Sequence, residues 1–392
     1  MNVLRSIKGD KVIWMIVLLF SLVSVIEVYS AVAQIASRFK GGNTGYYLVK
    51  HSLIICLGLG LMFMVHRMRY TLFSRLSQIA LWVSAPLLLY TLLKGHSAGG
   101  AARWLEIPGT GLTFQTSDFA KLALIVYLAR VLSIKQGQFN DFKTVFIHLL
   151  IPIGVICGLI LPANFSTAAL LGFTCFLLMY IGKVPLKYLL MVLGGGVLAL
   201  SMLVLVVLKF PDAFGRGGTW KHRIESFTSG DSDENFQAEQ AKIAIGTSGL
   251  FWGKGPGNST MRGFIPEASS DMIFPIIVEE LGLLIGGFVV LLYVIFLFRG
   301  IRIAQRSTKL FGTLSAFGLC FSLVLQAMIN MAVAVGLLPV TGQPLPMVSM
   351  GGTSIWFTSI TIGVILSVSR EMDKQEPPAG EEEEEGESRA AA

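Results

Sequence analysis

Ten stretches of about 20 mostly apolar residues recur along this chain of 392 residues. A bilayer core about 30 Å thick is crossed by a helix of that length. Only 14% of the residues are charged, whereas a soluble domain carries about 25%, which excludes a cytosolic enzyme, a disulfide scaffold and a disordered chain. The sequence therefore predicts an all-α polytopic membrane protein with ten transmembrane helices. The predicted segments are roughly 12–34, 48–66, 77–94, 115–134, 144–161, 166–183, 187–209, 271–298, 311–337 and 353–369.

Lys and Arg are unevenly distributed among the connections between these segments. If the N-terminus is cytoplasmic, seventeen of them fall in the inner connections and five in the short outer loops. Cytoplasmic loops carry an excess of Lys and Arg, so we expect both termini in the cytoplasm. The net charge of +7 reflects this bias, and we expect no nucleic acid partner.

Two segments differ from the rest in composition. Residues 210–270 form a long connection between the seventh and eighth predicted helices, on the outer face. Loops of this length are usually functional or disordered, and the helix-forming stretch 234–245 argues against disorder, so an active site is expected here. Residues 371–392 form an acidic, low-complexity tail that we expect in the cytoplasm, whereas residues 1–370 form the transmembrane domain.

The cysteines and histidines form no recognisable site. Each of the four cysteines lies alone in an apolar run without metal-ligand spacing, and the five histidines include no HExxH motif. The cysteines are expected to be small core residues. No disulfide or metal motif is predicted.

A first polar stretch contains Arg103, Asp118 and Lys121. Asp118 and Lys121 are three residues apart, so they share a helix face and can form an ion pair. Ionisable groups in a spanning helix are costly and normally face the interior of the bundle. The pair either holds helices together, or Lys121 and Arg103 also bind an anionic group from the outer leaflet.

A second stretch is rich in glycine and runs from Gly249 to Ser259. It lacks the GxxxxGK[ST] pattern of a nucleotide-binding loop. Backbone N–H groups of a glycine-rich turn can bind phosphate groups. The turn beside Lys254 is therefore a candidate pyrophosphate site.

A third stretch places Asp271 at the mouth of an apolar helix. Proline is tolerated only in the first turn of a helix, so Pro275 predicts an unkinked eighth helix that begins near Asp271, with Asp271 as its N-cap. An ionised acid at the membrane interface is a reasonable general base. Glu279 and Glu280 lie deeper, and at least one of them must point inward and be paired.

A fourth stretch, residues 336–352, contains three prolines and four glycines between two apolar helices. Irregular backbone at membrane depth must be sheltered by protein or must line a cavity. We therefore expect this segment to lie inside the bundle.

At these motifs the chain resembles the SEDS family, the membrane proteins of bacterial shape, elongation, division and sporulation. The resemblance covers almost the whole chain, and its motifs occur in family order. They include Gly-Ala-Ala-Arg103-Trp, Gln115-Thr-Ser-Asp-Phe-Ala-Lys121-Leu, Gly-Leu-Phe-Trp-Gly-Lys254-Gly-Pro-Gly-Asn-Ser259, Pro-Glu267-Ala-Ser-Ser-Asp271 and Gly-Leu-Leu-Pro-Val-Thr-Gly-Gln343-Pro-Leu-Pro.

The resemblance implies a peptidoglycan glycosyltransferase that polymerises lipid II at the outer face of the bacterial cytoplasmic membrane. It also implies a class B penicillin-binding protein as a partner, and other membrane proteins of the division machinery. The family's essential aspartate corresponds to Asp271, its cavity residues to Lys121, Asp118 and Arg103, and its loop glutamate to Glu267. The motifs favour the division-type branch, which acts at the septum, over the elongation-type branch.

The residues suggest roles for these groups. Asp271 would take the proton from a sugar hydroxyl, while Lys121, Arg103, Lys254 or a divalent cation (Mg²⁺ or Mn²⁺) would neutralise the leaving pyrophosphate. Two other functions remain open. The chain could be a lipid II flippase or ion carrier, because broken segments are typical of transporters, or a scaffold that only recruits a division transpeptidase.

Overall fold

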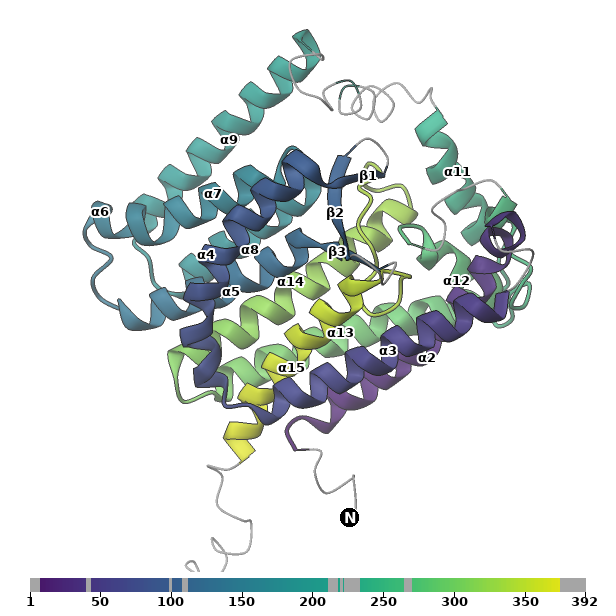
Figure 1. Cartoon of the computed structure of the whole chain (residues 1–392), viewed down its shortest axis with the longest axis horizontal. Helices are drawn as coiled ribbons and strands as arrows, with labels where there is room; N and C mark the ends of the chain where they lie inside the picture. The colour runs from purple at the N-terminus through teal and green to yellow at the C-terminus, as the bar shows by residue number, and fades with distance from the viewer. Residues whose placement is uncertain are drawn as a thin grey trace, which may run out of the picture.

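Long helices dominate the computed structural model, which describes residues 8–39, 44–98, 101–107, 112–210, 218, 221, 233–263 and 270–373 (Figure 1). The helices of the first half are α2 (Lys11–Phe39), α3 (Thr44–Arg67), α4 (Tyr70–Lys94), α5 (Thr116–Ile134), α6 (Phe142–Val145), the π-helical turn η1 (Phe146–Leu150), α7 (Ile151–Ile160), α8 (Phe165–Ile181) and α9 (Leu186–Lys209). Those of the second half are α11 (Asp233–Gly246), the 3-10 turn η3 (Thr260–Gly263), α12 (Ile273–Leu281), α13 (Leu283–Arg306), α14 (Leu310–Ala334) and α15 (Thr353–Asp373).

The helices have the length and composition of a polytopic membrane protein. Within the described residues, eight helical segments are long and apolar enough to cross a bilayer, and the shorter α8 is also apolar. The helix α5 carries Asp118, Lys121 and Arg130 within its 19 residues. The apolar segments predicted from the sequence are helical, but two of them are divided: residues 144–161 span the end of α6, η1 and α7, and residues 271–298 span α12 and α13. The fold is helical and polytopic.

The centre of the bundle is formed by α14 and α15, most of whose side chains are buried. The helix α15 packs along α3, and α14 packs between α5 and α13 (Figure 1). Glycine permits the close contact of α15 with α3: a Cβ at Gly363 would lie 2.9 Å from the Met62 carbonyl oxygen. Small residues at helix interfaces serve the same purpose in other membrane proteins.

The helix α9 is the most exposed of the long helices. Its buried side chains are Tyr188, Leu189 and Val207, Val192 packs partly against the core, and most of its other apolar side chains are exposed. In Figure 1 it extends away from the rest of the bundle. Such an apolar helix is typical of one that faces lipid.

A small antiparallel sheet corrects the prediction of an all-α chain. It consists of β1 (His96–Ala98), β2 (Ala101–Ile107) and β3 (Leu112–Gln115), in the order β1-β2-β3. Trp104 pairs with Gln115 across β2 and β3. The strands are short, so the sequence gives no clear pattern for them. They fold the connection between α4 and α5 back onto the start of α5.

The predicted eighth helix is broken, which corrects the expectation of an unkinked span. The helix α12 ends at Leu281 and α13 begins at Leu283. Gly282 between them has φ 98° and ψ 162°, a conformation that glycine adopts readily and other residues do not. The break therefore depends on the absence of a side chain at this position.

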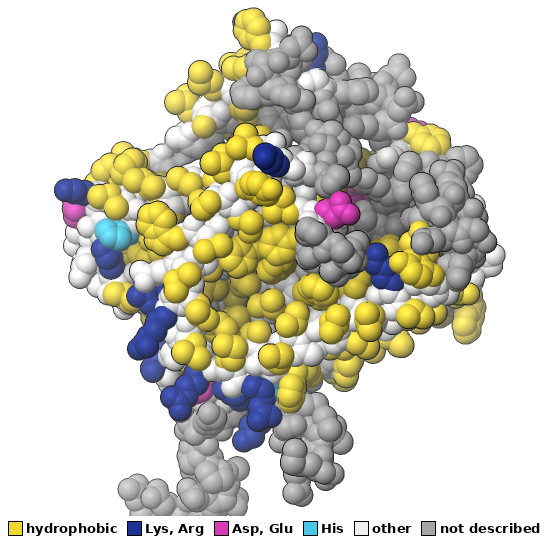
Figure 2. Space-filling model, in the orientation of Figure 1, with side chains coloured by type: hydrophobic (Ala, Val, Ile, Leu, Met, Phe, Trp, Pro, Cys, Tyr) yellow, Lys and Arg dark blue, Asp and Glu magenta, His cyan; other side chains and the backbone are white. Residues whose placement is uncertain are grey.

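The start of α2 and the end of α15 lie at the same end of the bundle. A Cβ at Gly9 would lie 3.1 Å from the Leu366 carbonyl oxygen. At this end the Arg370 guanidinium donates to the Arg67 carbonyl oxygen at 2.7 Å, and Arg299 forms an ion pair with Asp10. Figure 2 shows Lys and Arg side chains gathered here, below a broad hydrophobic surface.

Candidate active site

Asp271 lies in the turn that leads into α12. The helix begins at Ile273 with Met272 as its N-cap, so the prediction that Asp271 is the N-cap is wrong by one residue. Its side chain is half-buried, and its Oδ1 accepts a hydrogen bond from the Ser270 hydroxyl at 2.8 Å. Its backbone carbonyl accepts one from Asn330 Nδ2 at 2.7 Å. The backbone of the aspartate is thus fixed to α14.

The later part of the irregular segment 336–352 lies inside the protein, as predicted, whereas Leu337 and Leu338 near its start are exposed. Gln343, Leu345, Val348 and Ser349 are all buried. Asn330 Nδ2 also donates to the Gln343 carbonyl oxygen at 2.7 Å, and the Gln343 amide donates to the Thr167 hydroxyl at 2.6 Å. These bonds tie the segment to α8 and α14, since a buried polar backbone must find partners.

At Gly342 the acid and a cation lie close to the same point. Its φ is +61°, and a Cβ at this position would lie 3.1 Å from Asp271 Oδ2 and 3.7 Å from Arg103 Nη1. The carboxylate and the guanidinium therefore both lie beside the Gly342 backbone, in the space that a side chain would occupy. The three residues are more than 70 positions apart in the chain, and the fold brings them together.

Arg103 is held by the sheet and by the turn before α8. It lies on β2, and its Nε donates to the Ala163 carbonyl oxygen at 2.9 Å. It lines a pocket with about 320 Å³ of empty volume, whose walls combine apolar and polar side chains. The pocket is lined by Leu88, Thr91, Leu92, Arg103, Gln115, Thr116, Ser117, Leu159, Ile160, Ala163 and Asn164.

Asp118 and Lys121 form the predicted ion pair, with 2.8 Å between Lys121 Nζ and Asp118 Oδ1. Lys121 Nζ also donates to Gln326 Oε1 at 3.1 Å. The Gln326 amide in turn donates to the Pro344 carbonyl oxygen at 2.8 Å. The pair borders a second pocket between α5, α14 and α15. Hydrogen bonds thus connect Lys121 to the segment that carries Gly342.

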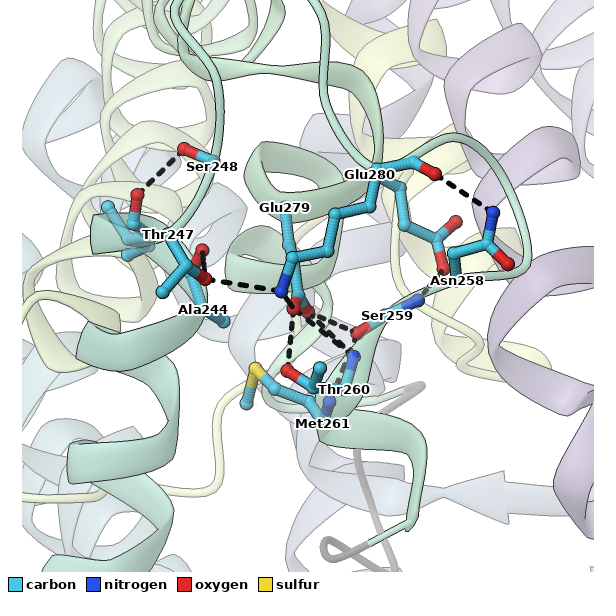
Figure 3. A network of polar contacts seen from close by, with 11 residues as sticks. Ala244, Thr247, Ser248, Asn258, Ser259, Thr260, Met261, Glu279 and Glu280 are labelled. Atoms are coloured by element: carbon cyan, nitrogen blue, oxygen red, sulfur yellow. Dashed lines mark hydrogen bonds and ion pairs between the residues drawn. The ribbon is translucent and has the colours of Figure 1, made fainter.

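Lys254 and Ser259 lie near the other end of α12, where they contact Glu279 (Figure 3). Lys254 Nζ lies 2.6 Å from Glu279 Oε1, and the Ser259 hydroxyl donates to Glu279 Oε2 at 2.6 Å. Glu279 and Glu280 are both buried and paired, as the sequence required of at least one. A role of Lys254 and Ser259 in binding substrate stays a prediction. Glu267 lies outside the described residues.

Asn330, Gln326, Gln343 and Gly342 belong to this site, although no role was predicted for them. Asn330 and Gln326 are four residues apart on the apolar helix α14 and so share one of its faces. Polar residues on one face of a spanning helix normally point into the bundle, and this pattern could have identified them. The roles of Gln343 and Gly342 depend on contacts between distant segments.

The arrangement is suited to proton transfer next to an anionic group. A carboxylate that lies beside a guanidinium remains ionised and can accept a proton. A cation close to the same point stabilises negative charge that develops during a reaction. Among the described residues no three His, Cys, Asp or Glu side chains gather as a metal site, and the predicted divalent cation stays a prediction.

Known proteins are similar in sequence to this chain along nearly its whole length. The chain is 30% identical to the probable peptidoglycan glycosyltransferase FtsW of Geobacter sulfurreducens over 373 residues, which cover 94% of this chain and 97% of the relative. It is 31% identical to the stage V sporulation protein E of Bacillus subtilis, with 93% and 98% covered. Both alignments run along nearly the whole chain.

Solved structures share the fold. A chain from a peptidoglycan synthase complex, whose study concerns the structural coordination of polymerization and crosslinking, superposes with a TM-score of 0.75 at 23% identity, covering 93% of this chain and 98% of that one. The rod shape determining protein RodA of Thermus thermophilus superposes with a TM-score of 0.66 at 23% identity, with 93% and 97% covered. The model of the FtsW/RodA/SpoVE family, described as cell cycle proteins, matches residues 10–374. The chain therefore belongs to this family, the SEDS family whose motifs its sequence carries.

Proposed function

We propose that this chain is a peptidoglycan glycosyltransferase that polymerises lipid II into glycan strands during septal wall synthesis. The observation that carries the proposal is that the Asp271 carboxylate and the Arg103 guanidinium both lie within 4 Å of the position that a Cβ of Gly342 would occupy. The names of its relatives, which include probable peptidoglycan glycosyltransferases, support the same activity and the division-type role.

Asp271 acts as the general base. It accepts the proton of the acceptor sugar 4-hydroxyl while that oxygen attacks the anomeric carbon of the donor. The bond to the undecaprenyl pyrophosphate breaks, a β-1,4 bond forms, and the configuration inverts in one displacement. An inverting reaction needs one carboxylate as base when the leaving group is already good. A single acid at this position is therefore sufficient.

Arg103 and Lys121 stabilise the negative charge of the leaving pyrophosphate. Arg103 presents a planar, permanently charged group that matches phosphate geometry. Lys121 forms an ion pair with Asp118 and lines the pocket between α5, α14 and α15. Fixed cations of this kind reduce the cost of charge that develops in the transition state. Glu267 remains a proposed contributor to substrate binding, whereas Lys254 and Ser259 contact Glu279 within the protein.

The proposed topology places the site at the periplasmic face of the cytoplasmic membrane. Ten spans, with α12 and α13 together as the eighth, would put both termini in the cytoplasm. The basic side chains near the start of α2 and the end of α15 (Figure 2) support this orientation. We propose 210–270 as the periplasmic connection, 1–370 as the membrane domain, 371–392 as the tail, and a class B penicillin-binding protein as the partner that crosslinks the strands.

Reconstitution with labelled lipid II tests the proposal. Purified protein with its cognate class B penicillin-binding protein in proteoliposomes should convert lipid II into strands that are resolved by gel electrophoresis. The partner's transpeptidase is blocked by a β-lactam, so that strand length reports polymerisation alone. Absence of polymer from a folded complex would contradict the proposal.

The same proteoliposomes distinguish the alternative of transport. The broken eighth helix and the buried irregular segment 336–352 are features that transporters also use. A flippase would move fluorescent lipid II between leaflets without forming polymer. Polymer formation that proceeds with lipid II supplied only on the outer side supports the synthase. A scaffold would give neither result.

A further inference from the structure

Residues 249–260, here called the strap, bridge the break between α12 and α13. On the α12 side, the backbone N–H groups of Lys254 and Gly255 donate to the carbonyl oxygens of Glu279 at 2.8 Å and Glu280 at 3.0 Å. On the α13 side, Leu283 N–H donates to the Gly249 carbonyl oxygen at 3.0 Å. Carbonyl groups at a helix end need such partners. The strap therefore holds α12 and α13 together across the break. Without it, Gly282 alone would connect the two helices.

Glu279 fastens the strap with its side chain (Figure 3). The carboxylate is fully buried. It accepts hydrogen bonds from Lys254 Nζ, the Ser259 hydroxyl and the Thr260 hydroxyl, all at 2.6 Å, and from the Thr260 N–H at 3.1 Å. Every partner is a donor, so the group must be an ionised acceptor. A buried charge is tolerated only when it is paired in this way.

Glu280 fastens the same strap to α2. Its carboxylate accepts hydrogen bonds from Ser259 N–H at 3.1 Å, from Gly257 N–H at 3.2 Å and from the Ser30 hydroxyl. Two consecutive glutamates thus join α12, the strap and the first long helix. Because backbone and side-chain bonds act together, α12 cannot rotate or slide without breaking several of them.

Asp271 lies just before the other end of α12. It precedes Glu279 by eight residues, a distance of about 12 Å along a helix. At this end Asn330 donates to the Asp271 carbonyl oxygen and the Ser349 hydroxyl donates to the Ser270 carbonyl oxygen. A tilt of α12 at the Gly282 break would therefore move the carboxylate relative to Arg103. A misplacement of about 1 Å can cost about 10²-fold in rate.

We infer that Glu279 is a positioning residue for the proposed polymerisation, which fixes α12 through the strap so that Asp271 meets its acceptor hydroxyl. The inference rests on the proposed function of Asp271.

The inference also assigns Lys254 a different role from the one the sequence predicts. Lys254 Nζ contacts Glu279 and the Thr247 hydroxyl, so its charge is paired with a carboxylate of the protein. On this inference Lys254 helps to hold the strap on α12 and binds no pyrophosphate.

A double-mutant cycle tests the inference in the reconstituted complex. Glu279→Gln and Lys254→Met should each lower kcat ten- to hundredfold, with KM changed less than twofold, because binding groups stay in place. The double variant should lose no more than either single variant, whereas Lys254→Arg, which keeps the pair, should retain most of the activity. If Lys254 binds pyrophosphate, Lys254→Met raises KM, and its effect multiplies with that of Glu279→Gln. That result would overturn the inference.

Three further variants distinguish a loss of positioning from a loss of stability: Gly253→Ala disturbs the strap, and Gly158→Ala and Asp10→Asn are the controls. Gly253→Ala should reproduce the loss of kcat without any change of charge, because a Cβ there would lie 2.4 Å from the Glu280 carbonyl carbon. Gly158→Ala in α7, where a Cβ meets nothing within 4 Å, should leave kcat unchanged. Asp10→Asn removes an ion pair at the opposite end of the bundle, so it should lower the melting temperature and leave kcat per folded molecule unchanged.

The outcomes also separate this inference from the proposed function. Wild-type complex that forms polymer, together with a Glu279→Gln variant of normal kcat, overturns the positioning role and leaves the proposed function intact. Folded wild-type complex that forms no polymer contradicts the proposed function itself. A kcat loss shared equally by Asp10→Asn would assign the effect to stability and overturn the inference.

Discussion

The residue that constrains the site most tightly is Gly342. Its φ of +61° is unfavourable for other residues, and a Cβ would crowd the Asp271 carboxylate at 3.1 Å. Gly342→Ala should therefore lower polymerisation at least tenfold, because the Asp271 carboxylate must move away from the added Cβ. The measurement is the initial rate of strand formation, normalised to folded protein. The control is Gly172→Ala, since a Cβ there meets nothing within 4 Å; equal losses in both variants would contradict this role of Gly342.

The ion pair of Asp118 and Lys121 offers a second test at the scale of residues. Lys121→Met leaves Asp118, which is buried, without its cation, and breaking such a pair costs about 3–5 kcal/mol. The double variant Asp118→Asn with Lys121→Met should recover most of that stability but no polymerisation, because Lys121 also stabilises the pyrophosphate. Thermal unfolding in detergent and the strand assay measure the two effects. Recovery of activity in the double variant would reduce the pair to a structural role.

At the scale of elements, the break at Gly282 makes a prediction about stability. Its φ and ψ of 98° and 162° lie in a region that only glycine adopts without strain, so Gly282→Ala should cost about 1–3 kcal/mol. In contrast, Gly287→Ala within α13, where a Cβ meets nothing within 4 Å, should be neutral or stabilising. Differential scanning fluorimetry compares the two variants. A stabilised Gly282→Ala protein would mean that α12 and α13 form one continuous helix.

Helices were predictable from the sequence, but their interruptions were not. The apolar segments are helical because an apolar run of about 20 residues has the length of a helix that crosses a bilayer. The break at Gly282 was missed because Leu281 and Leu283 continue the apolar pattern across it. The strands of residues 96–115 were missed because they are short and form a small sheet of their own. A local sequence pattern does not show which distant segment supplies the hydrogen bonds at a helix break, as residues 249–260 do at Gly282.

The charged members of the site were predictable, whereas its neutral members were not. Asp271, Arg103, Asp118 and Lys121 are conspicuous because charge in or near an apolar segment is costly. Gly342 has no such signal, because its importance comes from the two groups, Asp271 and Arg103, that lie close to it. The pairing of Lys254 with Glu279 was also beyond the sequence, since the two are 25 residues apart and lie on different elements.

At the scale of the whole molecule, the proposed topology makes a labelling prediction. With the four native cysteines replaced by alanine, Trp252→Cys should react with a membrane-impermeant maleimide in intact cells, because the Trp252 side chain is 87% exposed on the proposed periplasmic side. Gln138→Cys lies in the exposed turn after α5 and should react only after permeabilisation. Both variants must first react in detergent. The reverse pattern of labelling would mean that the protein has the opposite orientation in the membrane. The candidate site would then lie on the cytoplasmic face, which would contradict the proposed topology.

The central claim is that Asp271 is the general base. Asp271→Asn preserves the size of the side chain, and the bond from Asn330 goes to the backbone carbonyl, so the substitution leaves the fold intact. The decisive measurement is the rate of lipid II polymerisation by the Asp271→Asn protein with its partner, alongside its melting temperature. The account predicts a fall of about 10²–10⁴-fold at an unchanged melting temperature. A folded variant that polymerises at the wild-type rate would contradict it.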